Sequence, residues 1–235
     1  PFYALKSVLE KRGLPIGRCP PDSEVAVVSS FFLSLLKKPN SGHPVGGLSR
    51  ALCLQARTLT IMVDASLTAL GGVFALSDQD AIPTSIKYFS TPINLDCLGH
   101  WKCLLKDTAI PEESKNIVAF ELLAATMSLC SVRAFFGNLH TYNIVLYTDN
   151  EVTRHILEKM YSPKPALAGL LRAAVQTLAS LTLTVFTVQH VSSESNTIAD
   201  GLCRGRLEGI PEAWEKVEVD VECIPTPAGS FLTNP

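Results

Sequence analysis

The chain has few charged residues, few aromatic residues and no excess of positive charge. Only 18% of its 235 residues are charged and 7% are aromatic, whereas 47% are hydrophobic. This composition excludes a disordered chain, and the length supports one sizeable α/β domain with an appendage, or two small domains. Lys and Arg number 20 against 22 Asp and Glu, a net charge of −2, so no global positive field attracts polyanions. Any nucleic-acid role must therefore rest on local geometry or on metal ions.

The cysteines lack a disulfide pattern. They number seven, they are scattered, and none belongs to a CxxC pair, which is typical of a reducing compartment. No secretory signal follows Pro1. We therefore expect an intracellular protein of the cytoplasm or nucleus, not secreted, and a piece of a longer polypeptide. Cys97, His100 and Cys103 would bind zinc only if a fourth ligand joined them, and coincidence is the alternative.

Three regions differ in pattern. Residues 1–55 mix Pro and Gly around one apolar block, which predicts a helical or linker region. Residues 56–206 begin with three β-type runs and continue with helices alternating with strands, which predicts a mixed α/β sheet covered by helices. Residues 207–235 are acidic and Pro-bearing, which predicts a poorly ordered tail, with an edge strand at 217–224 as the alternative.

One apolar stretch has nearly the length of a membrane span. It covers residues 166–188 and carries a single charge, Arg172. The apolar residues recur at helical spacing up to about Ser180 and alternate as in a strand from Leu181. We therefore predict a helix followed by a strand, and no membrane partner.

Four single acidic residues interrupt segments that otherwise have the pattern of buried ones. Asp64 and Asp149 end two apolar strands, whereas Glu121 and Asp200 lie in two apolar helices. A buried carboxylate must be paired, protonated or metal-bound, because burying it unpaired is costly. We hypothesise that the four converge at one end of a central sheet.

Taken singly, each acid has another explanation. Asp64 and Asp149 are also typical turn residues at strand ends. Asp200 can face water on its helix. Glu121 can form a salt bridge with Arg133 or Lys102.

The order of acids and elements resembles the ribonuclease H family, in the form found in retroelement reverse transcriptases. The resemblance covers about residues 57–206. It is carried by the motifs Asp64-Ala-Ser66 with Gly71-Gly-Val-Phe74, Phe120-Glu-Leu-Leu-Ala-Ala125, Tyr147-Thr-Asp-Asn150 and the closing segment from His190 to Arg204. It implies an RNase H-like α/β fold: a mixed five-stranded sheet, three strands antiparallel and then parallel ones, flanked by helices. Ala69 and Cys203 depart from the common glycine and serine.

The resemblance implies an endonuclease that hydrolyses the RNA strand of RNA/DNA hybrids with two Mg²⁺ ions, Mn²⁺ being the substitute. A site built of carboxylates suits such hard cations. Asp64 would bridge both ions, with Glu121 and Asp149 on one side and Asp200 on the other. His190, expected on a loop, would transfer a proton or assist product release. The alternative for it is a bond to Glu194.

The resemblance also implies partners. These are the RNA/DNA hybrid and a polymerase domain of the same polyprotein, with residues 1–55 as the connection. It assigns substrate binding to Ser66, Asn150, Asn196 and Arg204, and Asn196 is also expected to be the N-cap of the last helix. Because Lys and Arg are dispersed, we expect weak, salt-sensitive binding to an isolated hybrid. Two alternatives remain open: a non-catalytic RNase H-like tether or interaction module of a retroelement-derived protein, and another nuclease of the same superfamily.

Overall fold

The computed structural model describes residues 57–78, 83–94, 98, 101, 113–137, 142–181 and 183–225. The predictions for residues 1–55 and for the Cys97, His100 and Cys103 triplet lie outside these residues.

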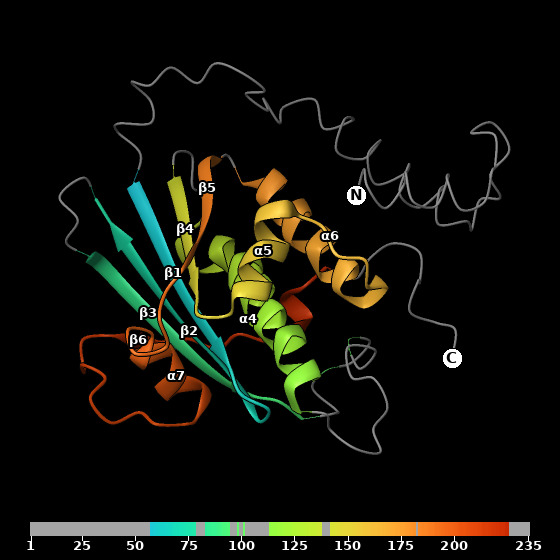
Figure 1. Ribbon diagram of the computed structural model, residues 1–235. Helices are drawn as coiled ribbons and strands as arrows, with labels where there is room; N and C mark the ends of the chain where they lie inside the picture. Colours follow the sequence, from blue (N-terminus) through green and yellow to red (C-terminus); the bar gives the residue numbers. More distant parts are fainter. Residues whose placement is uncertain are drawn as a thin grey trace, which may run out of the picture.

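One mixed sheet organises the described residues, in the order β5-β4-β1-β2-β3-β6 (Figure 1). Strands β1, β2 and β3 are antiparallel neighbours, whereas β4 runs parallel to β1 and β5 parallel to β4. The predicted fold class, three antiparallel strands followed by parallel ones, is therefore confirmed, but the sheet has six strands rather than five because β6 joins its edge. The strand bounds are β1 Arg57–Ala65, β2 Ala69–Ser77, β3 Pro83–Pro92, β4 Tyr142–Thr148, β5 Leu183–His190 and β6 Glu215–Lys216.

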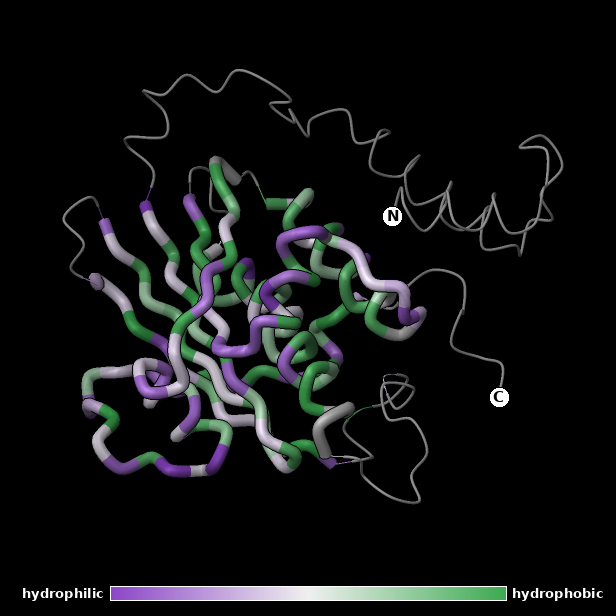
Figure 2. Tube along the Cα trace, viewed as in Figure 1, coloured by the Kyte–Doolittle hydropathy of each residue, from purple (hydrophilic) through white to green (hydrophobic). Residues whose placement is uncertain are grey.

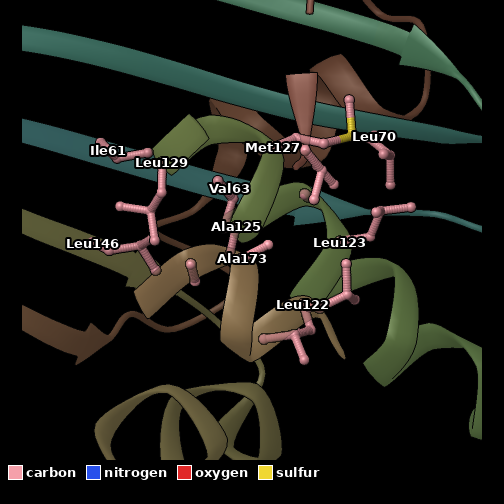
Figure 3. Close-up of a cluster of buried hydrophobic side chains, with 14 of the residues drawn as sticks. Ile61, Val63, Leu70, Leu122, Leu123, Ala125, Met127, Leu129, Leu146 and Ala173 are labelled. Atoms are coloured by element: carbon pink, nitrogen blue, oxygen red, sulfur yellow. The ribbon is translucent and has the colours of Figure 1, made fainter. Parts of the chain in front are cut away.

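Helix α4, Glu113–Phe136, is the central core helix. It packs against β1, β2 and α6, so apolar side chains on several of its sides are buried. Figure 3 shows the resulting cluster, which contains Leu122 and Met127 of α4, Ile61 of β1 and Ala173 of α6. By length and composition its segment Ile117–Phe136 would be able to cross a membrane, but 72% of the most apolar window is buried inside the fold.

The remaining helices are α5 Glu151–Lys159, α6 Pro165–Ser180 and α7 Thr197–Cys203. The prediction of a helix followed by a strand over residues 166–188 is confirmed by α6 and β5.

Helices α4 and α7 lie on opposite faces of the sheet. Neighbouring residues of a strand point to opposite faces, and on β2 the side chain of Leu70 joins the α4 cluster (Figure 3). Gly71, the next residue, faces α7 so closely that a Cβ there would be 2.6 Å from the backbone nitrogen of Cys203. Only glycine allows α7 this approach to the sheet.

The C-terminal segment is more ordered than predicted. Two residues, Glu215–Lys216, pair with β3 and form the edge strand β6, and a short 3₁₀ helix, η2, spans Val221–Cys223. Val219, Val221 and Ile224 are at most 5% exposed. The prediction of a poorly ordered tail is therefore wrong for residues 215–224, because their apolar side chains join the core.

Candidate metal centre

The structure brings the four acidic residues together at one end of the sheet, where strands β1 and β4 finish. Asp64 lies near the end of β1, and Asp149 follows the parallel neighbour β4, so both lie at this end. Glu121 comes from α4 and Asp200 from α7.

The acids form two clusters that share Asp64. One carboxylate oxygen from each of Asp64, Glu121 and Asp149 lies within 4.8 Å of the others. One ligand atom from each of Asp64, Asp200 and Cys203 also lies within 4.8 Å of the other two. Asp64 therefore stands between Glu121 and Asp149 on one side and Asp200 on the other.

Glu121 is the most strongly perturbed carboxyl of the site. Its residue is 2% exposed, and burial is the main cause that raises its pKa to about 10. The hydrogen bond to Asp64 and the negative charges of Asp64 and Asp149 raise this pKa further. At neutral pH the Glu121 carboxyl is therefore protonated, and Thr148 Oγ1 donates a hydrogen bond to its Oε2 (3.4 Å). The predicted alternative partner Arg133 lies twelve residues further along α4, about 18 Å of helical rise away.

Asp64 is buried between several donors. Burial raises its pKa most, and the charge of Asp149 adds to this. Hydrogen bonds from Glu121, from the Ala65 backbone and from Cys203 act in the opposite direction. The Ala65 N–H donates to Asp64 Oδ1 at 2.8 Å, and the Cys203 thiol donates to Oδ2 at 3.4 Å. The Asp64 carboxylate is thus held in a fixed orientation toward both clusters.

Asp149 is oriented by the segment that follows β5. Ser193 Oγ donates to Asp149 Oδ2 at 2.7 Å, and His190 Nε2 lies 3.1 Å from the Asp149 carbonyl oxygen. His190 is the last residue of β5 rather than a loop residue, and its Nδ1 lies 3.9 Å from Glu151 Oε1. Sequence reasoning missed Ser193 and Glu151. The only sequence signal for Ser193 was its place in the closing segment that carried the resemblance.

Asp200 forms an ion pair with Arg204, the residue at the C-terminal end of the same helix. Arg204 Nε donates to Asp200 Oδ1 at 2.6 Å. The resemblance assigns Arg204 to substrate binding, whereas the structure places its guanidinium on a proposed metal ligand. Cys203, also missed as a site residue, lies three positions after Asp200 and so on the same face of α7. Burial raises the pKa of the Cys203 thiol, which therefore remains a hydrogen-bond donor.

Three residues predicted to bind substrate make structural contacts. Asn196 is fully buried, and its Nδ2 donates to the Val63 carbonyl of β1 at 3.2 Å. Asn196 is the N-cap residue of α7, as predicted, but its side chain makes no capping hydrogen bond to the helix. Ser66 Oγ donates to the Cys203 carbonyl at 2.7 Å, and Asn150 Oδ1 accepts from Thr153 N at the start of α5.

The donor set fits a divalent cation. Asp64, Glu121 and Asp149 offer only carboxylate oxygens, the ligands that Mg²⁺ and Mn²⁺ prefer. The second cluster offers two carboxylates, while its thiol is engaged as a donor to Asp64. A bound cation would replace the proton on Glu121 and relieve the repulsion among the acids.

Comparisons with known proteins concern the fold. No protein-family model matches the chain, and no curated protein sequence matches it. The fold is similar to that of RNase H1 structures. RNase H1 of the halophilic archaeon Halobacterium salinarum gives a TM-score of 0.42 at 14% identity over 64% of this chain and 98% of that one.

A second similar structure, LC11-RNase H1 in complex with an RNA/DNA hybrid, gives a TM-score of 0.44 at 13% identity, over 64% of this chain and 96% of that one. The N-terminal RNase H domain of a Mycobacterium tuberculosis protein gives 0.41 at 12% identity, over 65% and 95%.

Proposed function

We propose that this chain is a divalent-metal-dependent endonuclease that hydrolyses the RNA strand of RNA/DNA hybrids. The observation that carries this proposal is the pair of clusters that share Asp64. A shared carboxylate is the arrangement that would hold two cations roughly 4 Å apart. Such ions, when bound, supply a water activated for attack and neutralise charge on the phosphate.

The chain's own residues would divide the remaining work. Glu121 and Asp149 complete one cation site with Asp64, and Asp200 completes the other. Ser193 fixes the orientation of the Asp149 carboxylate by its 2.7 Å hydrogen bond. His190, with 38% of its side chain exposed beside Glu151, would transfer a proton at the edge of the site or assist product release.

The proposal extends to the context of the domain. The motifs around Asp64, Glu121, Asp149 and Asp200 support a place in a retroelement reverse transcriptase, with residues 1–55 leading to a polymerase domain of the same polyprotein. The cellular setting would then be the cytoplasm or nucleus. Several cations of the domain are already paired with acids, as in the double pair of Arg154 with Glu151 and Glu158. This supports weak, salt-sensitive binding to an isolated hybrid.

The test is cleavage of a hybrid with a labelled RNA strand. We expect cutting with Mg²⁺ or Mn²⁺, none with EDTA, and at least a hundredfold slower cutting by Asp149→Asn, which removes one anionic ligand. Asp78→Asn is the matched control, because Asp78 is an exposed acid that pairs with Arg57 at the opposite end of the sheet. Metal-dependent binding without cutting would support a non-catalytic module instead, and cutting of duplex DNA would support another nuclease of this superfamily.

A further inference from the structure

A groove of about 620 Å³ opens beside Asp200, next to the proposed metal centre. It lies between α7 and the loop that joins α7 to β6, drawn in orange beside α7 in Figure 1. The residues that define its chemistry are Ile198, Asp200, Arg206, Glu208, Pro211 and Trp214. Because Asp200 belongs to both the groove and the acidic cluster, a molecule bound there would lie next to the phosphate to be cut.

The groove combines apolar surface with one available cation. Trp214 is half-buried and lines it, and Ile198 keeps 40% of its surface exposed. Arg206 is exposed, and its guanidinium has no ion-pair partner among the residues that the structure describes. Arg204, by contrast, is neutralised by Asp200. A groove lined by both a tryptophan and this arginine is suited to a nucleotide, whose base stacks on an aromatic ring and whose phosphate pairs with arginine.

The loop that forms the groove is fixed at both ends. The backbone N–H of Arg206 donates to the Gly201 carbonyl of α7 at 2.8 Å, and the backbone N–H of Trp214 donates to the Pro211 carbonyl at 2.9 Å. Directly after Trp214, β6 pairs with β3. Figure 2 shows hydrophobic and hydrophilic positions interspersed along this loop. The groove therefore exists before a ligand arrives, which reduces the entropy lost on binding.

We propose that this groove binds one unpaired nucleotide of a strand that extends beyond the hybrid. Its base would stack on Trp214 and its phosphate would pair with Arg206. The proposal rests on the proposed function of the neighbouring site, because that site places the nucleic acid. Glu208 also lines the groove, and its charge opposes a phosphate. Removing the charge of Glu208 should therefore strengthen nucleotide binding, whereas removing that of Arg206 should weaken it.

The test is binding of hybrids to the full chain in EDTA, where cutting is absent. The chain has two tryptophans, and Trp101 is fully buried. A ligand in the groove should therefore change the fluorescence intensity of Trp214 and leave that of Trp101 unchanged. A hybrid with a single-stranded extension should quench this fluorescence and bind about tenfold more tightly than a blunt hybrid of equal paired length. Trp214→Phe should remove the quenching, and Trp214→Ala should remove the tenfold preference.

Charge variants give the second readout. Arg206→Ala should weaken binding of the extended hybrid several-fold and make it less salt-dependent, whereas Glu208→Gln should strengthen it. Arg133→Ala, which removes an exposed arginine at the far end of α4, is the matched control and should change nothing.

The outcomes separate the two proposals. Equal affinity for blunt and extended hybrids, with unchanged Trp214 fluorescence, would overturn the groove assignment even if the parent cuts hybrids. Quenching by a single-stranded oligonucleotide that is lost in the Trp214 variants would support it even if no hybrid is cut.

Discussion

Replacing Glu121 by glutamine should stabilise the metal-free protein. In the unfolded chain this carboxyl has its ordinary pKa of 4.5, whereas burial and the neighbouring acids raise its pKa to about 10 in the folded state. The folded state therefore keeps a proton that the unfolded state releases above pH 4.5. The stability linked to this proton is complete below pH 4.5 and is lost as the pH rises toward 10.

The size of the effect follows from this pH window. Each pH unit inside the window costs about 1.4 kcal/mol, so the loss between pH 4.5 and pH 7 is at most about 3 kcal/mol. Glutamine has no charge to lose and retains an oxygen that can accept from Thr148. For a chain of this size, about 3 kcal/mol corresponds to a Tm increase of up to roughly 6–12 °C at pH 7.

The assay is thermal unfolding in EDTA between pH 5 and pH 8. The parent's Tm should fall with increasing pH, and the Tm of Glu121→Gln should fall less. Millimolar Mg²⁺ should then raise the parent's Tm by binding the folded state, and raise that of the variant less, because a charged ligand is missing. Glu218→Gln, at an exposed glutamate of the C-terminal segment, is the control and should leave Tm unchanged. A metal-free Glu121→Gln protein no more stable than the parent at pH 7 would refute the buried like-charge cluster.

Three further substitutions probe the supports of the site. Asn196→Ala leaves a backbone carbonyl of β1 without its buried donor, and should lower the free energy of unfolding by about 1–3 kcal/mol in urea titration. Gly71→Ala places a methyl group 2.6 Å from the Cys203 nitrogen, so it should cost about 1–3 kcal/mol and reduce the Mg²⁺-induced increase in Tm. Ser193→Ala should weaken Mn²⁺ binding in calorimetric titration by about tenfold, with stability nearly unchanged because Ser193 is exposed.

The sequence was most informative where a local pattern decides the structure. Alternation along β1 identifies this strand, because its apolar side chains are buried at a regular period. Helix α4 is indicated by the length of its apolar run instead, because residues 119–129 are all buried. The acids stood out for the same reason: Glu121 is the one charge in a long apolar helix segment, and such a position requires a special environment.

The residues that sequence reasoning missed owe their roles to tertiary contacts. Ser193 is 44 residues from Asp149, and Cys203 is 139 residues from Asp64. No local pattern in either segment indicates which residue is contacted, since the contact depends on the order of the strands. Strand β6 was missed because its two residues are too few to show a period. The pair of Arg204 with Asp200, by contrast, is a local contact between residues four positions apart, which helical spacing can indicate.

The shared position of Asp64 follows from the topology rather than from any single contact. Helices α4 and α7 pack on opposite faces of the sheet, so Glu121 and Asp200 approach the end of β1 from opposite sides. β4 is the parallel neighbour of β1 and delivers Asp149 to the same end. Among the described residues, only the acid near the end of β1 lies within reach of all three others, which is why Asp64 belongs to both clusters. A change that moves α7 alone should therefore disturb the Asp200 cluster and leave the Glu121 cluster in place.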